Sequence, residues 1–255
     1  MKLAEKTIDL ISGYTRSRIG TIVVGALGDM VSGQIHEELE RTQELNAAEQ
    51  VIMAAWLIAM LLSELTAYYN VKFVGVVGNH GRLKRKKEAK EKYVNWDYIV
   101  YQITSLLLRD NPRIEWLISK SPHAFVEIEG HLFLFTHGDT IKGWAGIPFY
   151  GISRYANNMR EILNKRKLIL DGLCMGHFHQ PANIERINGP IIVNGSLKGP
   201  DEYSLQRGAA MGPSQVLFGV GKYPKTFEYT LWLNERLQPS RWDLSVPNIW
   251  AEVEV

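Results

Sequence analysis

The sequence predicts an α/β fold whose strands form two sheets. Two observations predict it. Short apolar runs of strand length, rich in β-branched residues, alternate with longer segments of helical periodicity, and several of these runs end abruptly at a glycine followed by polar residues. The chain of 255 residues, with 45% hydrophobic and 22% charged residues, has the composition of an ordinary globular enzyme. Its length favours one sizeable core, so we predict a single domain spanning residues 1–255.

The first 80 residues contain two expected strands. An amphipathic helix is predicted over residues 2–17, because apolar residues recur on one side of it. A short, buried, β-branched strand follows over 20–27. A helical stretch over 34–69 separates it from the next strand at 71–77.

One apolar run, VIMAAWLIAMLL at 51–62, raises the question of a membrane span. It has only twelve residues and lies between Glu49 and Glu64, whereas a bilayer needs about 20 apolar residues. We therefore predict a helix that is buried on most faces and no membrane partner. Whether the helical region covers the core or forms a homo-oligomer interface is left open by the sequence.

The rest of the chain, from about residue 95, is richer in strands. A helix is expected over 95–109 and a helical run within 141–165, and the turn at Glu129-Gly130 between two alternating runs predicts a hairpin. A second hairpin is expected at Asn188-Gly189. The expected strands are 113–118, 123–128, 131–136 and 168–175, followed by 182–187, 190–194, 215–220 and 226–233, which complete a second sheet.

Charge and cysteine content restrict the classes of function. The net charge of +2 provides no general attraction to nucleic acid, so any such binding requires a local basic patch. The single cysteine, Cys174, excludes an internal disulfide and lies in an apolar run, which predicts a buried structural thiol. The N-terminal stretch MKLAEKTIDL lacks the continuous apolar core of a signal peptide. These features predict a cytoplasmic protein.

Four clusters of metal-binding residue types follow expected strands. Carboxylate, amide and imidazole ligands suit Mn, Fe, Zn or Co, and the absence of thiolates argues against a closed structural zinc site. Each cluster taken singly is typical of turns, which favour Gly, Asn and Asp. Their conjunction predicts a metal site. The clusters are Gly28-Asp29, Gly78-Asn79-His80, Thr136-His137-Gly138-Asp139 and Gly176-His177-Phe178-His179.

The order of these clusters resembles the calcineurin-like metallophosphoesterase family, over Ile19 to Ser196. The runs Gly-Asn-His-Gly-Arg at 78–82 and Asn-Gly-Ser at 194–196, followed by Asp201-Glu202-Tyr203, are similar to those of phage- and prophage-type members. The resemblance implies a metallophosphoesterase-like α/β sandwich of two mixed β-sheets flanked by helices, with two metal ions at the carboxyl ends of strands. It also makes the helical region between the first two clusters an elaboration of the family fold.

The resemblance assigns a role to each matching residue. Asp29 would bridge both metals, Asn79, His137 and His177 would complete the second metal, and His179 would bind the first. His80 would contact the phosphoryl oxygen or protonate the leaving group. Arg82 is a further candidate for phosphate binding, because a guanidinium can bind two phosphate oxygens at once. For Asp139, orienting a ligand imidazole and capping a turn are both left open.

One family motif has no counterpart in this chain. The Asp-x-His of the opening strand should precede Asp29 by tens of residues, and no such pair occurs between Met1 and Gly28. The chain is therefore expected to be N-terminally short of the family's first strand, through a shortened sequence, an alternative start or degeneration. The second metal keeps four protein ligands. The first keeps only Asp29 and His179, so its site is expected to be weak or empty.

The function predicted from these residues is metal-dependent hydrolysis of phosphate esters, with phosphodiesters favoured. Mn²⁺ is the expected metal, with Fe, Zn or Co as alternatives. A basic run at 82–93 is interpreted either as a solvated face or as a patch that attracts phosphate, and the second interpretation makes DNA or RNA the substrate of a nuclease. The alternatives are a phosphomonoesterase or protein phosphatase, and a catalytically impaired protein that binds metal or phosphate.

Overall fold

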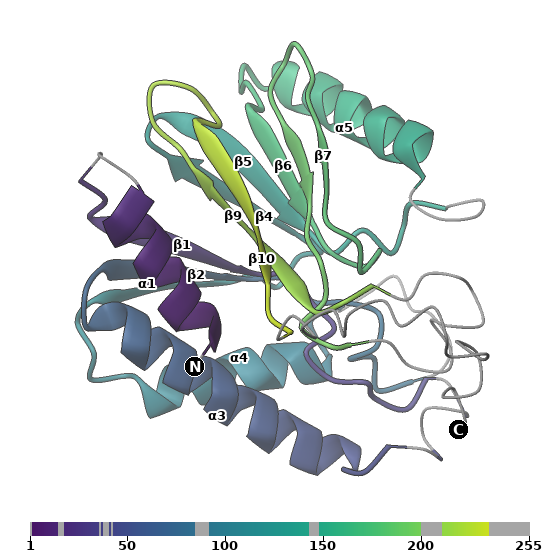
Figure 1. Ribbon diagram of the computed structural model, residues 1–255. Coiled ribbons are helices and arrows are strands. Elements are labelled where there is room, and N and C mark those ends of the chain that lie inside the picture. The colour runs from purple at the N-terminus through teal and green to yellow at the C-terminus, as the bar shows by residue number, and fades with distance from the viewer. Residues whose placement is uncertain are drawn as a thin grey trace, which may run out of the picture.

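A computed structural model of the chain shows four layers: helices, a sheet, a second sheet and a further helix (Figure 1). The predicted α/β class, with facing sheets between helices, is confirmed. The structure describes residues 2–14, 18–35, 37, 41, 43–84, 92–142, 148–199 and 211–234. Parts of the expected helix 2–17, of the helical stretch 34–69 and of the basic run 82–93 lie outside these residues, as does the whole of Asp201-Glu202-Tyr203.

The first sheet contains three parallel strands in the order β1-β2-β3. Parallel neighbours need long crossover connections, and helices α3 and α4 supply them on one face of the sheet (Figure 1). Because both faces of such a sheet are covered, its strands are largely apolar, and Lys72 of β2 and Glu115 of β3 form an ion pair. The elements are β1 (Thr21–Ala26), α3 (Ala47–Thr66), β2 (Asn70–Gly75), α4 (Trp96–Leu107) and β3 (Ile114–Ile118).

The helices of this half begin at well-formed caps. Asn46 and Glu49 form a reciprocal capping box at the start of α3, which satisfies two backbone N–H groups that the helix leaves unpaired. The side chain of Asn95 caps α4 by accepting from the backbone N–H of Asp97. A third helix, α1 (Lys2–Tyr14), packs against α3 and completes the outer layer.

The second sheet is mixed and has the strand order β4-β5-β6-β8-β7. Helix α5 (Phe149–Asn164) covers its outer face with Ile152, Ala156 and Leu163. Both predicted hairpins are present, since β4 pairs with β5 and β7 with β8 in antiparallel fashion. The strands are β4 (His123–Ile128), β5 (His131–Thr136), β6 (Gly172–Met175), β7 (Ala182–Ile184) and β8 (Ile191–Val193).

The two sheets pack face to face around a common apolar core, which includes Val74 from one sheet and Phe133 and Phe135 from the other. The sheets approach so closely at Gly25 that a Cβ atom there would lie 2.8 Å from the Phe135 ring. Glycine at this position of β1 therefore sets the distance between the layers. The same core encloses Cys174, whose predicted burial is confirmed and raises the pKa of its thiol to about 12.

Two expected features of the strands are wrong. The expected strands 215–220 and 226–233 do not join the second sheet. Among the described strands, β9 (Ser214–Gly219) and β10 (Phe227–Trp232) pair with each other and form a separate two-stranded sheet. The expected strand 168–175 begins at Gly172. Its first residues instead close helix α5, where Lys167 adopts a left-handed φ of 59° and the N–H of Leu168 bonds to the carbonyl of Leu163.

The prediction that the run 51–62 is buried on most faces is also wrong. The run lies in α3, where Ile52 and Trp56 are 65% and 56% exposed. Judged by length and composition alone, α3 is long and apolar enough to cross a membrane. Of its most apolar 18-residue stretch, 33% is buried in this structure. The helix packs on the sheet with one side only and presents a second apolar side outward.

Candidate metal centre

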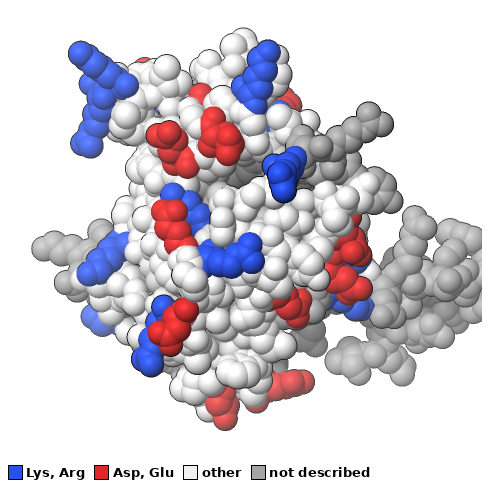
Figure 2. Space-filling view, turned by 90° about the vertical axis from the view of Figure 1, so that its left-hand side faces the viewer, with Lys and Arg blue, Asp and Glu red and all other residues white. Residues whose placement is uncertain are grey.

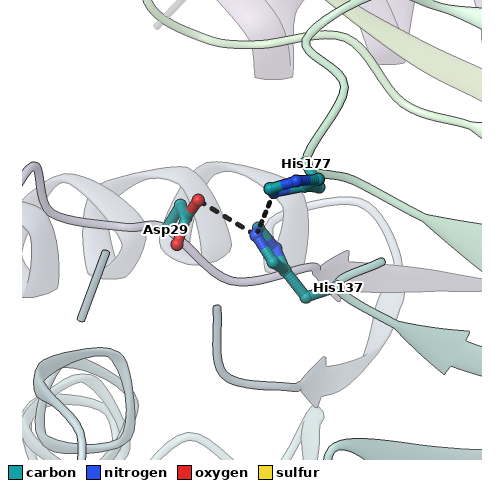
Figure 3. Close-up of side chains that lie close together, drawn as sticks. All are labelled: Asp29, His137 and His177. Carbon is teal, nitrogen blue, oxygen red and sulfur yellow. Dashed lines mark hydrogen bonds and ion pairs between the residues drawn. The ribbon is translucent and has the colours of Figure 1, made fainter. Parts of the chain in front are cut away.

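The predicted ligands lie where four strands end. In the first sheet, β1 leads to Asp29 and β2 leads to Asn79; in the second sheet, β5 leads to His137 and β6 leads to His177. Each pair of strands is parallel and adjacent, so its carboxyl ends meet at one edge. Because the sheets face each other, the two edges bring these loops together between the layers, as the close-up of Asp29, His137 and His177 shows (Figure 3).

One ring nitrogen, Nε2 of His137, lies at the centre of this cluster. It is 3.0 Å from Oδ2 of Asp29, 3.1 Å from Oδ1 of Asn79 and 3.2 Å from Nδ1 of His177. Ligand atoms of Asp29, His137 and His177 all lie within 4.8 Å of one another. The structure therefore brings together the four side chains that were predicted to hold the second metal.

The chemistry of these atoms calls for a cation. Nδ1 of His137 lies 2.6 Å from the carbonyl oxygen of Leu27, and since a carbonyl only accepts, Nδ1 is the donor. In the neutral ring Nε2 then carries a lone pair, and it faces oxygens of Asp29 and Asn79 that also only accept. Oδ2 of Asp29 is buried without a hydrogen-bond partner. A divalent ion bound by these lone pairs would satisfy all of them, so the residues fit a metal.

Electrostatics within the cluster keep the ligands in the forms that a metal needs. Burial opposes ionisation of Asp29, but the adjacent His137 and the nearby His80 hold the pKa of its carboxyl well below the usual range. Burial and the neighbouring His137 lower the pKa of His177 to about 4. The Asp29 carboxylate and the neutral His177 imidazole are thus both ready to bind a cation at neutral pH.

Backbone strain is concentrated at the same place. Asp29, His177 and His179 adopt left-handed φ values of 57°, 70° and 58°, a region that costs roughly 1–2 kcal/mol for a residue with a side chain. Such strain persists only where the surrounding structure enforces it, and it gathers at functional sites. Three predicted ligands carry this strain, which supports a functional origin for their placement.

Two glycines allow the first two loops to touch. A Cβ atom on Gly28, which has a φ of 87°, would lie 2.3 Å from the backbone nitrogen of Gly78. A Cβ atom on Gly78 would lie 2.1 Å from Oδ1 of Asp29. Only glycine fits at either position, and this close contact places Asp29 beside Asn79.

The two predicted catalytic residues lie next to the cluster. The backbone N–H of His80 donates to Oδ1 of Asp29 over 2.7 Å, and Nδ1 of its ring donates to the carbonyl of Ser32 over 3.0 Å. Nε of Arg82 donates to the carbonyl of Asn79 over 3.0 Å, which engages one of the five N–H donors of the guanidinium. Both side chains are half-buried.

Two other candidates are not members of the cluster, although the charges of both act on His177. His179, the expected ligand of the first metal, is exposed and does not belong to the group formed by Asp29, His137 and His177. Asp139 forms an ion pair with Lys92, with 3.6 Å between Oδ1 and Nζ. Among the described residues, the ligands of only the second metal are gathered.

Sequence reasoning missed a residue that holds the loops in place. The fully buried Asp97 at the start of α4 accepts hydrogen bonds from the backbone N–H groups of Asp29, Met30 and Gly78, at 2.9, 2.9 and 2.8 Å. Its neighbour Asn95 donates to the carbonyl of Gly78. Burial and the charge of Asp29 raise the pKa of Asp97 to about 6, while the three N–H bonds lower it. The sequence signal was an aspartate at a helix start, which is ordinarily read as a cap.

Metal affinity should rise steeply with pH because of His137. Burial lowers the pKa of its imidazole, but the negative charge of the adjacent Asp29 outweighs burial and raises the pKa above the usual value of 6.5. Below that raised pKa the ring carries a proton that a metal must displace, so affinity falls as pH falls. His177, with a pKa of about 4, stays neutral over the same range. We expect roughly a tenfold gain in Mn²⁺ affinity per pH unit below the pKa of His137.

Isothermal titration calorimetry with Mn²⁺ between about pH 6 and pH 8 checks this expectation. Parallel titrations in two buffers of different ionisation enthalpy count the protons released, and one proton per metal is expected at the acidic end. The exposed His179 should add none there. A pH-independent affinity with no proton release would contradict the role of His137 as a ligand.

Comparison with known proteins gives similarity of fold alone. No family model and no curated protein matches the chain. Among solved structures, a novel archaeal phosphodiesterase aligns over 89% of this chain and 91% of its own, at 14% identity and a TM-score of 0.43. Wild-type Vps29 complexed with Zn²⁺ from Entamoeba histolytica aligns over 84% of this chain and 94% of its own, at 16% identity and a TM-score of 0.41. A predicted phosphoesterase from Streptococcus pneumoniae aligns over 73% of this chain and 78% of its own, at 9% identity and a TM-score of 0.31.

Proposed function

We propose that this chain is a metal-dependent phosphoesterase that hydrolyses phosphodiesters. The observation that supports the proposal most is the convergence of Asp29, Asn79, His137 and His177 on one point, with acceptor atoms facing each other and a buried carboxylate oxygen left without a partner. Mn²⁺ is the proposed metal, and Fe, Zn and Co are compatible with the same two oxygen and two nitrogen ligands.

The ligands, Arg82 and His80 would each have a distinct role in the proposed reaction. The four ligands would hold a divalent ion, which supplies Lewis acidity at the phosphoryl group when bound. Arg82, held at the carbonyl of Asn79, would bind non-bridging phosphate oxygens with its remaining donors and so fix the ester beside the ligands. His80, oriented by its bond to Ser32, would donate a proton to the departing ester oxygen.

A nucleic acid is the proposed source of the phosphodiester, as the basic run at 82–93 suggests. On the side of the molecule shown in Figure 2, Lys and Arg are interspersed with Asp and Glu and form no continuous basic surface. Attraction to a polyanion would rest on the basic run, of which Arg82, Lys84 and Lys92 are described residues. Binding of DNA or RNA through these residues should weaken with salt.

A second candidate function is a metal-binding protein without turnover. It is favoured by one observation: among the described residues, the exposed His179 does not belong to the group formed by Asp29, His137 and His177. A single ion provides less charge neutralisation than the two-metal arrangement used for in-line displacement at phosphorus. Metal binding without hydrolysis would be the result.

Hydrolysis of bis-(p-nitrophenyl) phosphate in the presence of Mn²⁺ tests the proposal directly. Toward a dinucleotide, whose departing alkoxide needs a proton, the His80→Ala variant should lose about 100-fold or more of kcat, because a positioned general acid contributes roughly 10²–10⁴-fold. Its affinity for Mn²⁺ should stay within threefold of the wild type by calorimetry, since its ring is not a proposed ligand. The p-nitrophenyl monoester measured beside the diester checks the proposed preference.

His131→Ala is the matched control, because the ring of His131 bonds to the carbonyl of Gly221 away from the cluster. Its kcat should equal that of the wild type. Metal binding with no hydrolysis of either ester under Mn²⁺, Fe²⁺, Zn²⁺ or Co²⁺ would favour the second candidate function. An active enzyme that is indifferent to His80→Ala would refute the role given to this residue.

A further inference from the structure

The outer side of α3 and α4 is an exposed apolar surface with no role in the metal centre. On α3 the exposed residues follow helical spacing, so they line one face, and Trp56 lies at its middle. α4 packs beside α3 on the same face of the first sheet, and Oγ1 of Thr104 bonds to the carbonyl of Ala55 between them. This surface, named here the α3–α4 face, consists of Ile52, Met53, Trp56, Leu57, Met60, Ile99, Leu106 and Leu107.

The α3–α4 face is large for the surface of a monomer. These side chains are between 36% and 65% exposed, and together they present on the order of 700 Å² of apolar surface, given that a large side chain covers about 150–250 Å². The largest apolar patch on a typical monomer is about 300–600 Å², whereas each partner in a standard interface contributes roughly 800 Å². The area thus matches what one half of a stable dimer buries.

The chemistry of the face favours protein over lipid as its occupant. The only charged residues of α3 are Glu49 and Glu64, near its two ends, and the helix has no Lys or Arg. A helix that binds a membrane surface generally carries a basic polar side that attracts anionic lipids, and α3 lacks one. Trp and Met are enriched at protein interfaces, and charged residues are depleted at their centres.

We propose that the α3–α4 face binds a second copy of this chain and forms a two-fold symmetric dimer. In such a dimer the same surface meets itself, so it must be complementary to itself. A charged surface would repel its copy, but the centre of this one is uncharged and flexible in shape, because Met53 and Met60 flank Trp56. Apolar burial across the two-fold axis then supplies the association energy. The proposal is independent of the phosphoesterase function.

Sedimentation equilibrium of the wild-type chain from about 1 to 100 µM tests the dimer. The expected mass is twice the 29.0 kDa of one chain. Trp56→Glu should raise the dissociation constant at least about 30-fold, because it places a charge at the centre of the interface and removes its anchor. Met60→Lys, a second variant, should act in the same direction. Circular dichroism and thermal melting of each variant establish that it is folded.

Ile187→Glu is the matched control, because Ile187 is fully exposed in the turn between β7 and β8, outside the α3–α4 face. It should sediment as the wild type does. A wild-type chain that stays at 29.0 kDa throughout overturns the proposal. So does a dimer that Trp56→Glu and Met60→Lys leave intact, or flotation of a monomer with phosphatidylcholine or phosphatidylserine vesicles.

Discussion

Replacing Asp29 by asparagine is expected to abolish tight metal binding. The carboxylate of Asp29 is the one anionic group of the cluster. Its Oδ2 is buried without a hydrogen-bond partner and lies 3.0 Å from Nε2 of His137. The amide of asparagine has the same shape but carries no charge, and it would direct either a neutral oxygen or an N–H at the metal. We expect the affinity for Mn²⁺ to fall at least about 100-fold, with phosphoesterase activity lost in proportion.

Calorimetry with Mn²⁺ measures this affinity, and the metal-induced rise in melting temperature gives an independent reading, because a ligand that binds only the folded state stabilises it. Asp110→Asn is the control, since Asp110 is exposed and pairs only locally with Arg109. It should bind metal as the wild type does. An Asp29→Asn variant that keeps its affinity within threefold would exclude Asp29 as a ligand.

The clustering of the site is the kind of feature that sequence can predict. Asp29, Asn79, His137 and His177 each follow an apolar run, and the carboxyl ends of parallel strands meet at one edge of a sheet, so their proximity follows from topology. His179 is different. It lies two residues after His177, and both residues have a left-handed backbone. Among the described residues only His177 belongs to the group with Asp29 and His137, and sequence spacing alone does not distinguish the two. Their roles as ligands stay predictions.

The other wrong predictions concern interactions that the local sequence pattern does not show. Strand 168–175 was expected from its apolar composition, but Lys167 and Leu168 close helix α5 by backbone hydrogen bonds that any residue can form. The run 51–62 was expected to be buried because it is apolar. Periodicity shows that a helix is apolar on several sides, yet it cannot show whether a partner covers the second side. In a single copy of the chain this second side of α3 is exposed and forms part of the α3–α4 face.

Asp97 was missed because its function depends on contacts that are distant in sequence, and its replacement by alanine is expected to have the largest effect on stability. The carboxylate accepts from the N–H groups of Asp29, Met30 and Gly78, and it is 0% exposed. Alanine would leave three buried donors without an acceptor, each at a cost of about 1–3 kcal/mol. We therefore expect the free energy of unfolding to fall by roughly 3–5 kcal/mol, measured by urea denaturation.

Metal binding should distinguish a role of Asp97 in positioning the ligand loops from a role in core packing alone. Asp97→Asn keeps the volume and one acceptor oxygen, but its amide N–H₂ would face at least one backbone donor, so the loops of Asp29 and Gly78 should separate slightly while the chain stays folded. The affinity for Mn²⁺ should then fall about 10–100-fold, as for the loss of groups that orient metal ligands. Thr104→Val, which removes a buried hydroxyl of the same helix that bonds to Ala55 and Val100, should lower stability and leave metal affinity unchanged. If Asp97→Asn lowered stability alone, as Thr104→Val is expected to do, Asp97 would be a packing residue, and the loops would owe their positions to Gly28 and Gly78.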